Sequence, residues 1–554
     1  MKKSNITKGI IVLAAALAAA PSIQAQTMYD AMLFSQNNYT GTARTMAMGN
    51  AFTALGGDPG SIVLNPAGSA VSSKYQLSFT GGVSSTISKA TGVRLDTTGD
   101  PVYCFGDNSR TNLNRFIMPN FALTASFNIR NGSALKRVSF GITTNTTDLY
   151  QDNTYASGNH YGTSFAGYLA SKVSAPYSSL IDKDAYDSGI AWDAVMAAQS
   201  GMISTIDGSD DVYVGVTEKY FTSGEKPEFA AAGTLTQEYG RLVKGNKSDV
   251  VINCGFDISD WIYLGLNMGM QYINYNYDWY LKETAQDYGD FDISFNDNGS
   301  SVSTWFNDLK YNYWYKANGS GIYGKFGILL TPGKHFRVGA TVQTPTLLFI
   351  KENYGVSGET HFLESKYNSS SSSPTGEWSY NLTTPWRASL GLATTLGKWA
   401  AISADYEMAA YKGMRFGRNT SAEDSFRDVN TDIRECMGAQ HNFRFGAELK
   451  AFSILAFRLG YGMQSSPVMR SYDNSGELVR TAQAISNSVS GGLGINAGIF
   501  YADLAVRGLF YPVEYILPYD HYCLDASGNV TLPSPEIRNV KTMVNAVLTL
   551  GFRF

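Results

Sequence analysis

Side chains able to carry out acid–base, nucleophilic or metal chemistry are scattered along this chain of 554 residues. There is no GxSxG, HExxH, P-loop or CxxC pattern, the spacings that would place a nucleophile, a zinc ion, a phosphate or a thiol pair. The five histidines lie far apart, at His160, His335, His361, His441 and His521. His441 has no assignable serine partner. We therefore expect no enzyme activity, no cofactor and no metal.

One acidic run and four cysteines leave alternatives open. Residues 207–211, sequence DGSDD, cluster carboxylates as a calcium loop does, or form a solvated acidic loop. Cys104, Cys254, Cys436 and Cys523 are widely separated and make no metal signature. They are unpaired, or form one or two disulfides in an oxidising compartment. The formal net charge of −4 argues against a nucleic-acid partner.

The N-terminus has the pattern of an export signal. Three lysines lie before or next to an apolar run at residues 9–20, and the sequence IQA, ending at Ala25, predicts cleavage before Gln26. No cysteine stands at position 26, so a lipoprotein anchor is excluded. The apolar run is shorter than the roughly 20 residues that a spanning helix needs. No other stretch reaches that length, so strands must make any membrane span.

Alternating apolar and polar residues recur along the chain, and the last such segment ends on its final residue. In residues 539–554 the apolar residues share one phase: Val544, Ala546, Leu548, Leu550, Phe552 and Phe554. Lipid permits only helices or closed sheets, so a continuous apolar strand face here predicts a transmembrane barrel. Charged residues are only 16% of the chain and aromatic residues 13%, as aromatic girdles around a barrel require. Phe554 also fits the C-terminal signal that the barrel assembly machinery recognises.

Counting these segments predicts an all-β fold, a transmembrane antiparallel β-barrel of about 14 strands. The predicted strands are residues 75–83, 119–129, 138–147, 239–258, 261–281, 322–330, 335–351, 384–396, 399–411, 441–450, 453–464, 486–496, 498–510 and 539–554. Short turns alternate with long polar segments at 148–236, 283–320, 352–383, 412–440 and 511–538, which we interpret as extracellular loops. Within the first of these, residues 190–206 have apolar residues at helical spacing and predict a short capping helix.

A segment without alternation precedes the first predicted strand. Residues 41–70, GTARTMAMGNAFTALGGDPGSIVLNPAGSA, resemble the N-terminal plug, or hatch, of the FadL-type outer-membrane transporters, which include toluene-transporter relatives. The matching positions are Gly49, Ala51, Gly57, Asp58, Ser61, Asn65, Pro66, Ala67 and Gly68. Leu64 stands where the family usually has an aromatic residue. Residues 319–346 and 443–467 also look like family strands, so the resemblance covers roughly the whole mature chain.

The resemblance implies three parts: a signal peptide at 1–25, a plug at 26–70 and a barrel at 71–554. It implies a carrier of long-chain fatty acids or similar hydrophobic small molecules, which bind in the lumen and leave after plug movement. Sideways exit would occur near a distorted third strand, here 138–147, where Gly141 is the candidate. The candidate pocket residues, which packing against the wall explains equally well, are Met46, Met48, Phe52 and Leu55.

A fatty acid's carboxylate often meets a basic residue in this family. Five arginines fall on the plug or on lumen-facing phases: Arg44, Arg337, Arg444, Arg458 and Arg507. We expect most of them to pair with lumen acids, which are Asp405, Glu407, Glu448 and Asp503.

Two other functions compete with transport. A solute-specific porin would have a wet, polar lumen, and a surface adhesion protein would use tyrosine-rich loops, here 272–280 and 311–315, with the barrel as an anchor. For all three we expect a monomer in the bacterial outer membrane, in contact with its lipids.

Overall fold

The computed structural model of the chain describes residues 26–554 apart from gaps at 93, 96–101, 104, 107, 130–133, 161, 207–208, 224–225, 298–299, 334, 398, 419, 421–423, 452–453, 473–477, 521–522, 525–529 and 533–534. The predicted signal peptide lies outside the described residues, and so does part of the acidic run 207–211. Cys254 and Cys436 are free thiols.

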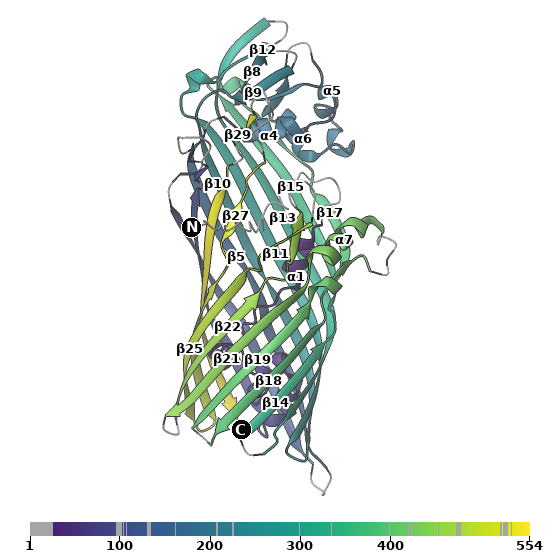
Figure 1. Cartoon of the computed structure of the whole chain (residues 1–554), viewed down its shortest axis with the longest axis vertical. Helices are drawn as coiled ribbons and strands as arrows, with labels where there is room; N and C mark the ends of the chain where they lie inside the picture. Colours follow the sequence, from purple (N-terminus) through teal and green to yellow (C-terminus); the bar gives the residue numbers. More distant parts are fainter. Residues whose placement is uncertain are drawn as a thin grey trace, which may run out of the picture.

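Fourteen antiparallel strands of the described chain close into a barrel (Figure 1). The strands are β1 (Gln76–Gly92), β4 (Ser109–Asn128), β5 (Leu135–His160), β10 (Leu235–Ile258), β11 (Ile262–Ala285), β13 (Ser300–Leu330), β14 with β15 (Phe336–Gln343 and Leu347–Phe362), β17 with β18 (Gly376–Thr383 and Arg387–Leu396), β19 (Ala400–Ala410), β21 (Ala439–Ala451), β22 (Leu455–Ser465), β25 (Ile485–Ala497), β26 (Phe500–Phe510) and β30 (Ile537–Arg553). The last strand pairs with the first, from Gln76 opposite Arg553 to Gly92 opposite Ile537. The predicted fold class is confirmed.

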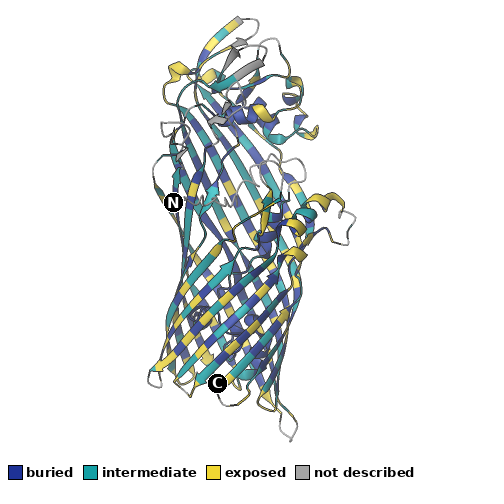
Figure 2. Ribbon diagram, viewed as in Figure 1, coloured by how far each residue is buried: buried dark blue, intermediate teal, exposed yellow. Residues whose placement is uncertain are grey.

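Each strand of the lower barrel presents one phase outward and the other into the lumen (Figure 2). On β30, Leu548 and Leu550 are exposed, while Asn545 and Thr549 are fully buried. Phe554 points outward and stacks on Tyr75 with ring centroids 6.0 Å apart. The outward phase of the lower barrel is therefore an apolar band, as a lipid-facing wall requires.

Several strands continue well above this band. β13 is 31 residues long and β5 is 26 residues long. On β11 the exposed outward residues change from Met268 to Asn274, and on β13 they change from Ile322 to Asn318. The interpretation of 283–320 and 352–383 as loops is therefore wrong over most of their length. Outside the band the outer phase is polar because it meets water, so the apolar alternation that marked the lower strands is absent.

A small cap of helices and hairpins covers the upper end of this extension (Figure 1). It contains α4 (Phe165–Lys172), α5 (Tyr177–Leu180) and α6 (Trp192–Gln199), the last within the segment predicted to be helical. The Ser164 hydroxyl caps α4 by accepting the Gly167 N–H at 2.9 Å. A further helix, α7 (Arg427–Cys436), projects from the side at mid-height. No helix among the described residues is long and apolar enough to cross a membrane.

The chain before β1 is folded inside the barrel. It contains α1 (Met28–Ser35), α2 (Ala43–Ala47), α3 (Ser61–Leu64) and the 3₁₀ helix η1 (Pro66–Val71). Its side chains are almost all buried. The boundary predicted at residue 70 falls within η1, and the first strand begins at Gln76. We call residues 26–71 the inner segment.

Candidate functional site: the lumen and its inner segment

The barrel wall approaches the inner segment most closely at glycines. A Cβ added at Gly265 would lie 2.2 Å from the carbonyl carbon of Pro66, and one at Gly327 would lie 2.1 Å from Asn65 Oδ1. One at Gly339 would lie 2.0 Å from the carbonyl oxygen of Thr53. Close contacts of this kind recur at Gly391, Gly446 and Gly460. Only glycine lets the two backbones touch here, so these strands are built around the inner segment.

Asn65 and its neighbours connect the inner segment to two wall strands. The Asn65 side-chain amide donates to the carbonyl of Thr53 at 2.6 Å and to that of Ile328 on β13 at 3.1 Å, and its oxygen accepts the Ala67 N–H at 3.0 Å. The Pro66 carbonyl accepts a bond from the Asn253 amide on β10 at 3.0 Å. The Asn-Pro-Ala turn therefore positions the segment against the wall.

The remaining residues of the predicted plug motif shape the segment itself. One Asp58 oxygen accepts the Thr42 hydroxyl at 2.7 Å and the Gly60 N–H at 2.9 Å. Gly49 and Gly57 have φ of 62° and 73°, which disfavours any residue with a Cβ. At Gly68 the limit is space, because a Cβ would lie 2.7 Å from the Ser61 hydroxyl.

Charged side chains form two chains of ion pairs in the lumen, of which the first joins the inner segment to the wall. Arg44 binds Glu448 at 2.8 Å, Glu448 binds Arg458 at 2.7 Å, and Arg458 binds Asp503 at 2.6 Å. All three wall members are at most 5% exposed. The charges of these two arginines and two acids neutralise one another, as predicted for the lumen arginines.

The second chain is centred on Glu407, which Arg387 and Arg444 reach at 3.1 and 3.0 Å. Asp405, by contrast, accepts the Thr53 backbone N–H at 2.7 Å. The predicted acids therefore bind arginine or the inner segment's own backbone.

Two predicted lumen arginines bind backbone oxygens instead of acids. Arg337 donates to the Leu55 carbonyl at 2.7 Å. Arg507 donates to the Tyr39 carbonyl at 2.7 Å and to the Thr40 hydroxyl at 2.9 Å. Both hold the inner segment in place.

The four candidate pocket residues are packed in the resting structure. Met46, Met48 and Phe52 are fully buried, and Leu55 is 6% exposed. Met46 packs among wall residues such as Ile117, while the other three belong to a second apolar cluster. None of them lines either of the two cavities described next.

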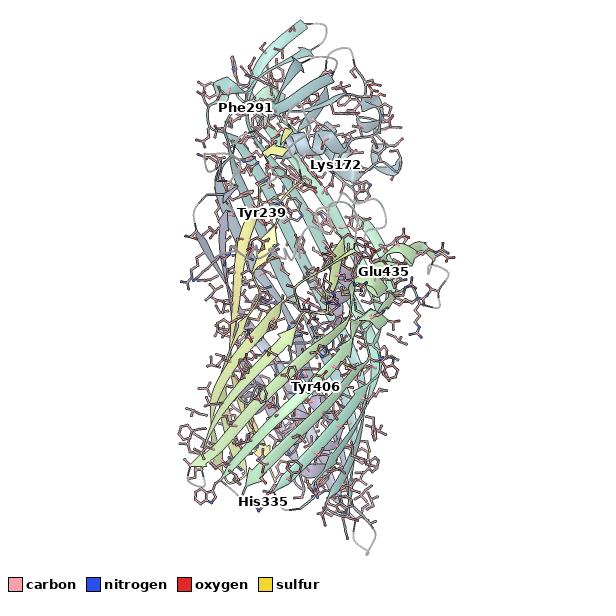
Figure 3. The ribbon with its side chains drawn as sticks, in the orientation of Figure 1. Lys172, Tyr239, Phe291, His335, Tyr406 and Glu435 are labelled. Atoms are coloured by element: carbon pink, nitrogen blue, oxygen red, sulfur yellow. The ribbon has the colours of Figure 1, made fainter. Side chains whose placement is uncertain are left out.

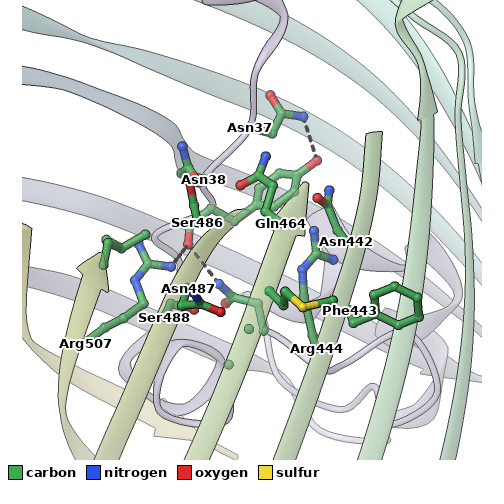
Figure 4. Close-up of a pocket in the computed structure, with 16 residues that line it drawn as sticks. Asn37, Asn38, Asn442, Phe443, Arg444, Gln464, Ser486, Asn487, Ser488 and Arg507 are labelled. Atoms are coloured by element: carbon green, nitrogen blue, oxygen red, sulfur yellow. Dashed lines mark hydrogen bonds between the residues drawn. The ribbon is translucent and has the colours of Figure 1, made fainter. Parts of the chain in front are cut away.

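Two adjoining cavities lie beside the inner segment. The outer one, of about 140 Å³, is formed by α1, the upper ends of β22 and β25, and the turn after β26. The inner one is about 50 Å³ (Figure 4). Three residues line both: Asn38, Gln464 and Ser486. The cavities are therefore neighbours, separated at the stretch of the inner segment that contains Asn38.

The wall has a seam between its second and third strands. β4 pairs with β5 from Asn128 opposite Arg137 up to Asn120 opposite Asn145, and no described pair continues beyond. β4 nevertheless pairs with β1 up to Ser109. Pro119, which has no N–H to donate, stands where the β4–β5 ladder ends. Above this point β5 stays paired with β10, and eight successive residues, 145–152, are buried.

The inner segment occupies the edge of β5 that the seam exposes. The Asn38 N–H donates to the Thr147 carbonyl at 2.6 Å, and the Thr40 N–H donates to the Thr146 carbonyl at 2.9 Å. Beside them, the pairing of β5 with β10 shifts register between Lys247 and Ser248.

Gly141 lies below this irregularity, in the regular part of the β4–β5 ladder opposite Thr124. A Cβ there would meet the Ile62 side chain at 3.1 Å. The strand is irregular, as the resemblance implies, but the register shift and the unpaired edge lie at Thr146 and Thr147 and not at Gly141. Threonine in a strand gives no sequence signal of such an irregularity.

Comparison with known proteins gives structural likeness only. No family model and no curated protein matches the chain. Among solved structures it is similar to a Pseudomonas aeruginosa FadL homologue, at 10% identity and TM-score 0.48, over 93% of this chain and 99% of the other. It is also similar to the Pseudomonas putida toluene transporter TodX, at 11% identity and TM-score 0.45, over 94% and 99%. The Ralstonia pickettii toluene transporter TbuX follows, at 14% identity and TM-score 0.42, over 93% and 98%.

Proposed function

We propose that this protein carries hydrophobic small molecules inward across a bacterial outer membrane, and that the inner segment is its plug. The observation that carries this proposal is the position of Asn38–Thr40. Asn38 lines both cavities, and the N–H groups of Asn38 and Thr40 bind the edge of β5 at the seam. A molecule entering the cavities therefore meets the part of the plug that holds the wall closed.

The outer cavity has the lining expected for an amphipathic or aromatic ligand. Met32, Pro512 and Val513 give it apolar surface, and Tyr511 and Lys541 give it a polar edge. A dry cavity of about 150 Å³ in another protein holds benzene, so about 140 Å³ has room for roughly one aromatic ring or a segment of acyl chain. A longer fatty acid would need the plug to move.

Exit would be sideways through the seam. Phe116 and Met118 of β4 are exposed on the apolar band just above the point where the β4–β5 ladder ends. A ligand displacing Asn38–Thr40 from β5 would thus reach the lipid-facing surface at that level. In this mechanism Met48, Phe52 and Leu55 become pocket lining only after the plug shifts, and Gly141 keeps the lower part of β5 close to the plug.

The proposal includes how the protein reaches the outer membrane and in what form it works there. The chain is exported with its signal segment removed, is inserted by the barrel assembly machinery through the strand ending at Phe554, and works as a monomer surrounded by outer-membrane lipid.

A reversible clamp tests the proposal. Thr40 and Thr146 form an antiparallel bridge, whose Cα separation suits a disulfide. The four native cysteines are replaced by alanine, and Thr40→Cys and Thr146→Cys are introduced. Uptake of radiolabelled toluene and oleate is measured in a bacterial host that lacks such a transporter. We expect oxidation to stop uptake of the transported compound and reduction to restore it.

The matched control joins two wall strands without touching the plug. Phe79→Cys and Leu550→Cys lie opposite one another on β1 and β30. Oxidation of this pair should leave uptake unchanged. Equal uptake by the oxidised and reduced Thr40–Thr146 clamp would refute release by plug movement.

A further inference from the structure

A buried glutamate lies in the upper lumen with no cation beside it. Glu352, 4% exposed, sits on β15 above the apolar band, where its neighbour Lys351 faces outward. One carboxylate oxygen accepts the hydroxyls of Tyr315 and Tyr380, and the other accepts the side-chain amide of Gln26 at 3.0 Å. Within the described chain Glu352 forms no ion pair. Burial raises the pKa of Glu352 to about 7.

A second buried acid lies near enough for its charge to raise the pKa of Glu352 further. Asp30, in the first turn of α1, is 9% exposed and accepts the Thr27 backbone N–H and hydroxyl, both at 2.8 Å. It too has no ion pair among the described residues. Two buried carboxylates repel each other when both are ionised, so a cation bound between them would stabilise their charged forms.

The predicted processing of the chain supplies that charge at this place. Hydrolysis of the Ala25–Gln26 peptide bond by the export peptidase consumes one water, leaving a carboxylate on Ala25 and an ammonium on Gln26. The Gln26 α-nitrogen is three covalent bonds from Thr27 N, so it lies within about 7 Å of Asp30 Oδ2. The side-chain oxygen of Gln26 is also buried without a hydrogen-bond donor.

We propose that Glu352, Asp30, Tyr315 and Tyr380 form a binding site for the chain's own N-terminal ammonium group, which exists only after cleavage before Gln26. The ammonium supplies the missing cation and fixes the start of α1. Because Met32 of α1 and Gln36, which directly follows the helix, line the outer cavity, processing of the chain completes the wall of that cavity. The proposal concerns this site alone and does not depend on what the barrel transports.

The first measurement is the intact mass of the purified protein. We expect a chain that starts at Gln26 and keeps its free amine. A different first residue would overturn the proposal. So would cyclisation of Gln26 with loss of ammonia, because a lactam has no ammonium.

The second measurement is the rate at which a small amine-acylating reagent modifies the N-terminus at pH 7, read by peptide mass spectrometry. An ordinary α-amine has a pKa near 8 and reacts readily, whereas an ion-paired and buried one is protected. We expect at least about tenfold slower labelling in the folded wild type than in Glu352→Gln, since one pKa unit is a tenfold change. Glu377→Gln is the control, because Glu377 is exposed on the outer face of the neighbouring strand.

The wild type alone provides a test that survives if Glu352→Gln fails to fold. Its N-terminal amine should label at least about tenfold more slowly in the native barrel than in the chain unfolded by guanidinium, corrected with a free peptide of the same N-terminal sequence. Equal rates in the two states, or equal rates in folded wild type and folded Glu352→Gln, would overturn the proposal.

Discussion

The lower barrel and the upper extension differ in the side chains that they turn toward the lumen. In the lower barrel the inward phase is glycine, small polar residues and ion pairs, and it meets the backbone of the inner segment. In the extension the inward phase is rich in aromatic side chains, and its Arg241 pairs with Asp152 and Glu514, each at 2.6 Å. Trp279 and Tyr311 have ring centroids 5.0 Å apart, and Phe165 of the cap lies 5.0 Å from Tyr311. Figure 3 shows side chains crowding both regions.

This difference indicates that the contacts in the lower lumen can break and re-form, whereas the contacts in the upper lumen keep that end closed. A hydrogen bond between the inner segment and the wall is worth only about 0.5–1.5 kcal/mol net, because water can replace it when the groups separate. Buried aromatic pairs have no such replacement and resist opening. The polar lower lumen therefore suits a plug that shifts, and the aromatic upper lumen suits a fixed cover.

α1 links the two regions. Its Phe34 lies 6.0 Å from Tyr275 of the aromatic extension, and its C-terminal end leads directly into Asn38–Thr40 at the seam. An event in the upper lumen can thus reach the seam through a single short helix.

The largest effect should come from removing the plug. Deletion of residues 26–70 empties the lower lumen, and a barrel of fourteen strands is wide enough to conduct once emptied. We expect no large, steady channels from the intact protein in planar bilayers and large, steady channels from the deletion variant. Heat-modifiable migration in gels confirms that the variant is folded. Steady channels in the intact protein would favour a porin, and a silent, folded deletion variant would refute the plug.

A smaller effect should follow from breaking one ion chain of the lower lumen. Glu448→Gln leaves Arg44 and Arg458 facing each other without their shared carboxylate. Removing one partner of a buried pair costs about 3–5 kcal/mol, so thermal unfolding should occur at a clearly lower temperature. The control is Glu377→Gln, which loses only an exposed pair with Lys351 and should change little. Similar unfolding temperatures for the two variants would mean that the lower lumen is wet and not packed.

The same contrast explains what could be predicted from sequence. All fourteen wall strands were located, because lipid imposes an apolar outer phase on each of them. The predicted pairing of lumen arginines with acids was also confirmed at Arg44, Arg444 and Arg458. Both results follow from one rule, that groups which cannot face lipid must find partners inside.

The parts of strands that lie above the apolar band could not be located in this way. The segments 272–280 and 311–315 were interpreted as tyrosine-rich surface loops, but they are strands whose Tyr277 and Tyr311 face the lumen. Their outer phase faces water, so no apolar period marks them. The wall glycines at Gly265 and Gly339 were also missed, since a glycine in a strand does not reveal what approaches it.

The smallest expected effect tests the cap of the upper extension by pH. Asp193 of α6 accepts the Tyr311 hydroxyl at 2.9 Å, and burial raises its pKa from 3.8 to about 6. When the cap opens, the carboxyl regains its ordinary pKa, so between about pH 4 and 6 the closed cap binds more protons than the open one. The stability of the closed cap must then fall as pH rises through this window.

Hydrogen exchange of the α6 amides, corrected for the intrinsic pH dependence of exchange, measures this stability. We expect protection to decrease from pH 4 to pH 6.5 in the wild type and to decrease less in Asp193→Asn. Some decrease remains in the variant because Glu283, which accepts the Phe165 N–H of the cap at 2.7 Å and whose pKa burial raises to about 7, still titrates. The lower barrel serves as the internal reference, because Asp193 has no contact with it. If the wild type and Asp193→Asn lose protection in parallel, the cap is not held against the extension through Asp193. Contacts such as those of Phe165 with the Tyr311 ring and the Glu283 carboxylate would then hold it.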